Sequence, residues 1–121
     1  MDAFSNNTAL ETFTFNGSSV LETVDGGAFR NDNKLTHFNF PATVKTIGGS
    51  AFNGTTSMTH VTFDAPSQLK KIANAAFQNA SALENIDLPE GLEEIERDAF
   101  NKCTSLTEIG IPASVTKIDP T

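Results

Sequence analysis

Residues 99–118 of the chain read AFNKCTSLTEIGIPASVTKI. Its apolar positions follow a fixed order: Ala-Phe, a Leu, two apolar residues separated by one position, a Pro, and a Val-x-x-Ile pair. The Ala-Phe dipeptide occurs with steps of 25, 23, 25 and 23 residues, at Ala3, Ala28, Ala51, Ala76 and Ala99. An ordinary globular core has no reason to keep this period, so the sequence predicts a solenoid of about five stacked repeats.

Each repeat contains two extended segments. In the first, apolar residues stand two positions apart, as in Phe38 and Phe40, which is the period of a β-strand. Pro41 then ends the strand, since Pro has no N–H to donate. The second segment is shorter, as in residues 44–47. Around Ala-Phe we expect one helical turn with its Phe buried, because too few residues remain for a full helix.

Two features of the apolar pattern bear on the core and the surface. All ten Phe residues occupy repeat positions, five after Ala and five in the first segments, so we expect all of them in the core. The first and third repeats are two residues longer than the others, and in the third the extra residues fall within residues 64–67. Insertions of this kind predict a surface loop.

The unit 99–118 resembles the BspA-like leucine-rich repeat, whose pattern is Ala-Phe-x-x-Cys-x-x-Leu-x-x-Ile-x-Ile-Pro-x-x-Val-x-x-Ile. The resemblance covers nearly the entire chain, although the Cys of the pattern is kept only at Cys103 and is replaced elsewhere by Asn7, Asp32, Thr55 and Ala80. The resemblance implies a solenoid of the α/β class that consists mostly of β-strands. Its chain would form a right-handed leucine-rich-repeat coil with a parallel β-sheet on the concave face. It also implies a cell-surface or secreted protein of bacteria or parasitic protists, used in adhesion or host-protein binding.

The repeat boundaries follow from the Ala-Phe positions. We expect a single domain over residues 1–121, with repeats at approximately 3–27, 28–50, 51–75, 76–98 and 99–121. The sequence begins within one unit and ends after the second strand of another, without a capping segment. Terminal repeats normally need a polar outer face. We therefore expect a fragment of a longer array, or ends that associate with another copy.

The outward residues of the first strands form two columns, which are the predicted recognition surface because this sheet is the usual binding face of leucine-rich repeats. The predicted ligand-binding residues are Thr12, Thr14, His37, Asn39, His60, Thr62, Asn85, Asp87 and Glu108. Gly110 completes the second column.

Both histidines of the chain, His37 and His60, fall in neighbouring places of one column. Stacked imidazoles could share a metal ion or make recognition sensitive to pH, because histidine titrates near neutrality. Asp87 is two repeats from His37 and in the other column, too far to complete a compact metal site. The simplest interpretation is a pair of solvated ladder residues, and we predict no metal site.

Charged residues alternate in sign along the second strands. They are Glu22, Lys45, Lys70, Lys71, Glu93, Glu94 and Lys117, and they predict ion pairs between neighbouring coils. Most of the net negative charge lies between Glu84 and Asp98, where seven acidic residues face only Arg97. Calcium binding there would require carboxylates that converge from one tight turn, whereas these point to different faces. A solvated acidic belt is the better interpretation.

Composition excludes several functions. The net charge is −7 and basic residues do not cluster, so nucleic acid would be repelled. No apolar run is long enough for a membrane-spanning helix, and the N-terminus has no signal-peptide pattern. We find no nucleophile motif and no phosphate-binding loop. Glycosylation sequons occur at Asn6, Asn16, Asn53 and Asn79, and they matter only in a eukaryotic host.

These features favour a non-enzymatic binding or adhesion module without a cofactor. Its partner would be a protein, such as a host or extracellular-matrix protein, or a cell-surface ligand. The absence of Trp and Tyr favours a broad polar contact. The alternatives are a structural spacer or self-stacking array, and an accessory domain of a larger secreted enzyme.

Overall fold

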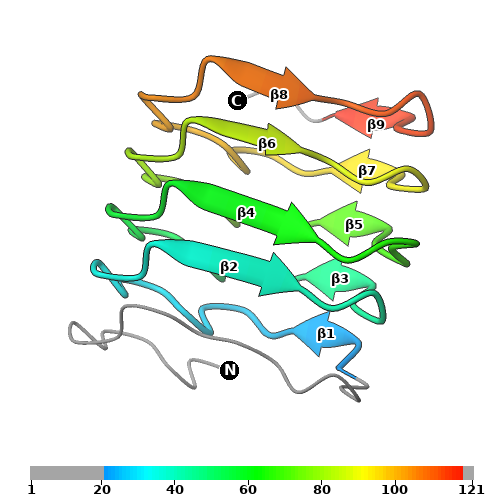
Figure 1. Cartoon of the computed structure of the whole chain (residues 1–121), viewed down its shortest axis with the longest axis horizontal. Helices are drawn as coiled ribbons and strands as arrows, with labels where there is room; N and C mark the ends of the chain where they lie inside the picture. Colours follow the sequence, from blue (N-terminus) through cyan, green and yellow to red (C-terminus); the bar gives the residue numbers. More distant parts are fainter. Residues whose placement is uncertain (1–20, 119–121) are drawn as a thin grey trace.

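The computed structural model describes residues 21–118, which form a stack of about four parallel β-coils (Figure 1). Each coil passes through two sheets on opposite sides of the stack. The first sheet has the order β2-β4-β6-β8 and consists of His37–Phe40, His60–Phe63, Asn85–Asp87 and Glu108–Gly110. The second has the order β1-β3-β5-β7-β9 and consists of Thr23–Val24, Thr46–Ile47, Lys71–Ile72, Glu94–Ile95 and Lys117–Ile118.

All strand pairs of both sheets are parallel, and each strand pairs with the equivalent strand of the next coil. The register follows the repeat: Phe38 lies beside Val61, and Ile47 beside Ile72. This architecture confirms the predicted solenoid with a parallel sheet. No helix of the length and apolarity needed to cross a membrane occurs within residues 21–118.

The segment around each Ala-Phe differs from the predicted helical turn. In the first described unit, the N–H groups of Ala28 and Arg30 donate to carbonyls three residues back, those of Asp25 and Gly27. The N–H of Phe29, between them, donates instead to Ala51 O of the next coil at 2.7 Å. In a helix, successive N–H groups all donate to carbonyls of the same segment. The alternation of local and inter-coil bonds therefore gives consecutive turns, and residues 21–118 contain no helix.

The core is an aromatic and aliphatic column between the two sheets. The rings of Phe29, Phe52, Phe77 and Phe100 stack at centroid distances of 5.1, 5.3 and 5.4 Å, nearly parallel to one another. Phe52 is completely buried, and Phe38 and Phe40 of the first sheet pack edge-on against its ring. These contacts confirm the predicted core position for the described Phe residues other than Phe63 and Phe100, which are half-buried and pack against the core. Phe63 is discussed below.

Close backbone contact sets the spacing of the coils on one side. The N–H of Gly48 donates to Val24 O at 2.7 Å. A Cβ at position 48 would lie 2.5 Å from Gly26 N and 2.7 Å from Val24 O. Only glycine allows the two coils to approach this closely here.

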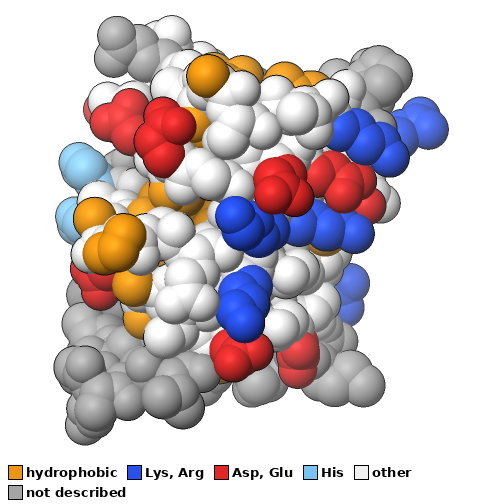
Figure 2. Space-filling view, turned by 90° about the vertical axis from the view of Figure 1, so that its right-hand side faces the viewer, with side chains coloured by type: hydrophobic (Ala, Val, Ile, Leu, Met, Phe, Trp, Pro, Cys, Tyr) orange, Lys and Arg blue, Asp and Glu red, His pale blue; other side chains and the backbone are white. Residues whose placement is uncertain are grey.

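The second sheet carries the predicted ladder of ion pairs between coils. Three of its pairs are Glu22 with Lys45 at 3.7 Å, Lys70 with Glu93 at 3.8 Å, and Glu94 with Lys117 at 3.6 Å. Figure 2 shows Lys or Arg and acidic side chains next to one another on the face turned to the viewer. This arrangement confirms the predicted cross-coil ion pairs.

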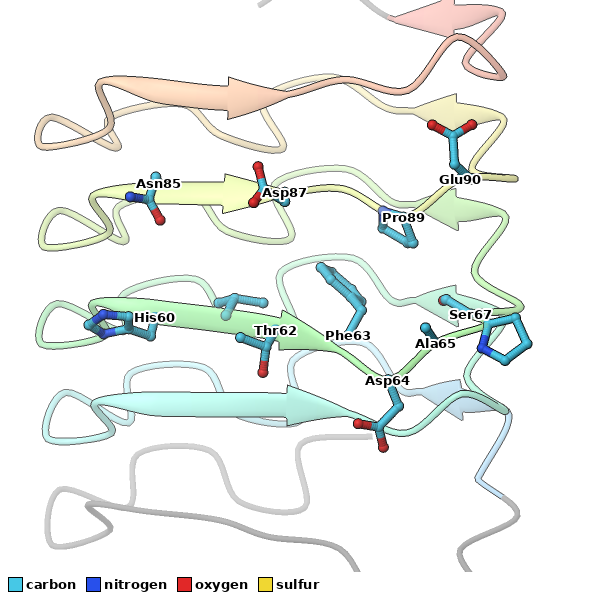
Figure 3. Close-up of a pocket in the computed structure, with 12 residues that line it drawn as sticks. His60, Thr62, Phe63, Asp64, Ala65, Ser67, Asn85, Asp87, Pro89 and Glu90 are labelled. Atoms are coloured by element: carbon cyan, nitrogen blue, oxygen red, sulfur yellow. The ribbon is translucent and has the colours of Figure 1, made fainter.

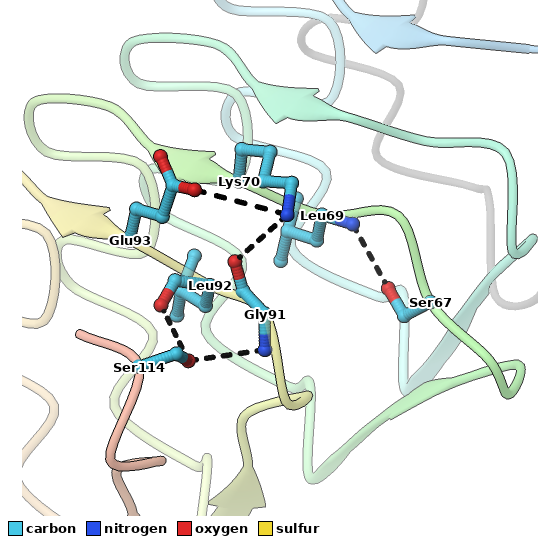
Figure 4. A network of polar contacts seen from close by, with 7 residues as sticks. All are labelled: Ser67, Leu69, Lys70, Gly91, Leu92, Glu93 and Ser114. Carbon is cyan, nitrogen blue, oxygen red and sulfur yellow. Dashed lines mark hydrogen bonds and ion pairs between the residues drawn. The ribbon is translucent and has the colours of Figure 1, made fainter.

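Two further contacts reinforce this ladder. Lys71 lies 3.1 Å from Glu96, and this hydrogen-bonded pair lowers the pKa of Glu96 below its ordinary value. The hydroxyl of Ser114 donates to Leu92 O and accepts from Gly91 N, which joins two neighbouring coils (Figure 4). The second sheet thus satisfies many of its charged and polar groups internally.

Candidate functional site

The structure brings the predicted binding residues into two columns on the outer face of the first sheet. His37, His60, Asn85 and Glu108 are in register in one column. In the other, Asn39 lies beside Thr62, and Asp87 beside Gly110. The side chains of His37, Asn39, His60, Thr62, Asn85 and Asp87 are exposed. Thr12 and Thr14 lie outside the described residues.

The two histidine rings are stacked, and each is held by one hydrogen bond at Nδ1. Their centroids are 4.9 Å apart and their planes differ by 5°. Hydrogen bonds of 2.9 and 2.8 Å join each Nδ1 to the hydroxyl of the preceding residue, Thr36 or Thr59. The repeated Thr-His pair therefore orients both rings in the same way. Within residues 21–118, no three His, Cys, Asp or Glu side chains come together in a way that could hold a metal ion.

Hydrogen bonds also order the second column. The hydroxyl of Thr62 donates to Asn39 Oδ1 at 2.7 Å, and Asn39 Nδ2 donates to Asp64 Oδ1 at 3.0 Å. This chain connects β2, β4 and the loop after β4. Higher in the column, a Cβ at Gly110 would lie 2.9 Å from Asp87 Oδ1, so the glycine leaves room for the carboxylate.

A hollow of about 500 Å³ opens beside the columns, between β4 and β6. The ladder between these strands pairs only His60 with Asn85, whereas β2 and β4 are paired at four positions and β6 and β8 at three. We call this hollow the β4–β6 groove (Figure 3). It is lined by residues 60–67 together with Asn85, Asp87, Pro89 and Glu90.

Phe63 forms part of the groove, which makes it an exception among the strand phenylalanines. The equivalent residues in the neighbouring coils, Phe40 and Leu88, are 1% and 6% exposed, whereas Phe63 is only half-buried. One face of its ring stacks on Phe40 at a centroid distance of 5.0 Å. An apolar surface that the regular repeat would cover is thus accessible at the groove.

The sequence does not predict the groove. It predicts a surface loop at the two extra residues of the third repeat, which is correct, since Asp64, Ala65 and Pro66 are exposed. The repeat pattern does not indicate that Phe63 and this loop form one wall of a hollow. The feature of the sequence that could have indicated the groove is an insertion within residues 64–67 that contains Pro66 and directly follows Phe63.

Within residues 21–118, the remaining ionisable side chains give no second site. In the acidic stretch from Glu84 to Asp98, Glu93, Glu94 and Glu96 pair with lysines of the second sheet. Cys103 donates a hydrogen bond to Phe77 O at 3.1 Å, and burial raises its pKa to about 11. A protonated thiol is a poor nucleophile. At the equivalent repeat position Asp32, Thr55 and Ala80 are fully buried.

A stack of parallel two-strand coils around an apolar ladder, with an ordered polar face outside it, defines a leucine-rich-repeat type of solenoid. The family model of the BspA type leucine rich repeat region matches residues 1–121 in six copies. The chain therefore belongs to the BspA-type leucine-rich repeat family. Repeats of this class commonly mediate protein interactions and are generally not enzymes.

Solved structures of bacterial proteins share the fold. A leucine-rich repeat protein of T. pallidum is 31% identical, with a TM-score of 0.77 over 82% of this chain and 45% of that one. One from Bacteroides ovatus is 25% identical, with a TM-score of 0.69 over 98% and 35%. A leucine rich cell surface protein from Faecalibacterium prausnitzii, at 23% identity and a TM-score of 0.53 over 89% and 42%, shows the fold alone. The chain spans less than half of each of these structures. No curated protein matches it.

Proposed function

We propose that the outer face of the first sheet is a binding surface for another protein and that the chain acts in adhesion at a cell surface or in secreted form. The observation that carries this proposal is the pair of outward columns. Hydrogen bonds hold four of their exposed polar side chains in place, those of His37, Asn39, His60 and Thr62. Side chains that are ordered before binding lose less conformational freedom when a partner arrives.

The contrast between the two sheets supports the choice of face. On the second sheet, ion pairs between coils neutralise exposed charges, as for Lys45 with Glu22 and Lys70 with Glu93. On the first sheet, the imidazole, amide and hydroxyl groups that point outward are suited to hydrogen bonds with a partner. Surface exposure of the protein is supported by its membership of the BspA-type leucine-rich repeat family.

A binding assay with purified extracellular-matrix proteins tests this function. Each matrix protein is immobilised, and binding of the wild-type chain is compared with that of His37→Ala and of Lys45→Ala. We expect at least one matrix protein to bind, a weaker interaction for His37→Ala, and no change for Lys45→Ala on the second sheet. Absence of binding to the whole set, or equal losses in the two variants, would refute the proposal.

Self-association along the stack is a second candidate, which one observation favours. The exposed large hydrophobic side chains of the described residues all lie in the last coil: Ile109, Ile111 and Ile118, at 36%, 46% and 55%. Another coil of the same kind could cover them. Light scattering of the wild-type chain would then show a mass that rises with concentration, and Ile118→Lys would reduce the rise. A constant monomer mass contradicts this candidate.

A further inference from the structure

We propose that the β4–β6 groove binds an extended segment of a partner protein that presents one apolar side chain next to Lys or Arg. This inference rests on the proposed protein-binding function and gives the partner's chemistry at one place on the face. It combines three observations about the groove: an uncovered apolar floor, an acidic border, and a size suited to a few residues.

The apolar floor comes first. Phe63, half-buried where Phe40 and Leu88 of the neighbouring coils are buried, lies with Val61 and Pro66 on one side of the groove, and Pro89 lies on the other. Figure 2 shows exposed hydrophobic side chains close to the two histidines, with acidic side chains on both sides of them. An apolar side chain placed on this floor would remove the accessible part of the Phe63 ring from water, which is favourable for binding.

The acidic border of the groove favours a positively charged partner. Asp64, Asp87 and Glu90 line the groove, and the lining includes no Lys or Arg. The Asp64 carboxylate points toward β2, where it accepts a hydrogen bond from Asn39, and that of Asp87 points toward β8 (Figure 3). The carboxylates therefore surround the apolar floor rather than cover it. Basic side chains on either side of a bound apolar group would be attracted to these carboxylates.

The size of the groove fits a short segment. A hollow of about 500 Å³ accommodates a few side chains, and an extended chain advances about 3.3 Å per residue. A second copy of this chain is poorly suited as the occupant, because its net charge is −7 and its lysines on the second sheet are engaged in ion pairs. A basic segment of a different protein satisfies both the apolar and the charge requirement.

Selection from a phage-displayed library of random heptapeptides on the immobilised chain tests the proposal. Enriched peptides are synthesised with a fluorescent label, and their affinities are measured by anisotropy. We expect enrichment of peptides with an apolar residue beside Lys or Arg, and affinities that fall as the salt concentration rises. No enrichment, or enrichment of neutral or acidic peptides, would overturn the proposal.

Two triple variants with the same change in net charge localise the binding. Asp64→Asn, Asp87→Asn and Glu90→Gln together neutralise the groove, whereas Glu93→Gln, Glu94→Gln and Glu96→Gln neutralise three acids of the second sheet. The groove variant should bind the selected peptides roughly three- to tenfold more weakly, and the second-sheet variant should bind them nearly as well as the wild type. Equal losses would show that net charge, and not the groove, attracts the peptides.

Other occupants give different results. If free arginine competes as well as the peptides do, the groove binds small cations and the proposal is wrong. If the wild-type chain self-associates and the groove variant does not, the groove binds a second copy, which also overturns it. Phe63→Ala should also weaken the binding of the selected peptides, because it removes the apolar floor. Circular dichroism checks that this variant folds.

The two proposals can fail separately. His37 lies in the predicted column outside the groove, and Asp64 and Glu90 line the groove outside the predicted columns. If His37→Ala abolishes matrix-protein binding and no basic peptide is selected, the binding face stands and the groove proposal fails. If basic peptides bind in the groove and no matrix protein binds the chain, the adhesion proposal fails and the groove proposal stands.

Discussion

The imidazole rings of His37 and His60 are stacked across β2 and β4, with 4.9 Å between centroids and 5° between their planes. Both rings are exposed and lie outside the core. They are thus a feature of the surface that the coil does not need for packing. Changing them should affect recognition and leave the fold intact.

The double substitution His37→Ala and His60→Ala should change the free energy of unfolding by no more than about 0.5 kcal/mol, the usual range for surface positions. Urea denaturation followed by circular dichroism measures this change. A loss several times larger would mean that the stacked pair is a structural element of the sheet.

Replacing Phe52 should have the opposite effect. Its ring is fully buried between Phe29 and Phe77, so Phe52→Ala leaves a cavity in the middle of the stack. We expect a loss of about 3–5 kcal/mol in the free energy of unfolding. Phe63→Ala is the matched control and should cost clearly less, because the Phe63 ring is only half-buried. Equal losses in the two variants would contradict the observed burial.

Adjacent glycines test the close approach of two coils. A Cβ at Gly48 would lie 2.5 Å from Gly26 N, whereas at Gly49 the nearest neighbour, Asn74 O, is at 3.4 Å. Gly48→Ala should therefore destabilise the chain by about 1–3 kcal/mol, the range typical of overpacking. Gly49→Ala should have a much smaller effect, and thermal unfolding of the two variants compares them directly. The reverse order would show that the coils are not in contact at Gly48.

The buried thiol of Cys103 should make the stability of the folded chain depend on pH. Burial raises its pKa from 9.0 to about 11, so the thiol stays protonated in the folded chain at pH values where an unfolded chain already forms thiolate. The stability associated with the neutral thiol is present below pH 9.0 and is lost as the pH rises toward 11. Alkylation by iodoacetamide near neutral pH should be slow in the folded chain and fast in urea. Equal rates would contradict the buried thiol.

The repeat made most of the fold predictable. Because Ala-Phe recurs with a nearly constant period, the columns and their register could be deduced before any coordinates, including the neighbouring positions of His37 and His60. The turn at Ala28-Phe29 could not be deduced. Its N–H groups alternate between local carbonyls and those of the next coil, and such a division depends on the stacked neighbour rather than on local sequence.

The groove was also outside the reach of the sequence, for a related reason. An insertion at residues 64–67 predicts a loop, but it does not tell how far the following strand separates from β4. At the groove, Phe63 stacks on Phe40 and the ladder between β4 and β6 is paired at His60 and Asn85 alone, and neither feature can be read from the repeat period. Regular positions are thus predictable from the repeat period, whereas the groove depends on how the irregular coil packs against its neighbours.

Hydrogen exchange of the complex is the most direct test of the binding face. The chain is bound to a matrix protein identified in the binding assay, and amide protection is compared with that of the free chain by mass spectrometry. Added protection should appear in β2, β4 and β6 and in the loop of residues 64–67. If protection appears instead in β3, β5 and β7 of the second sheet, or nowhere, the first sheet is not the binding surface.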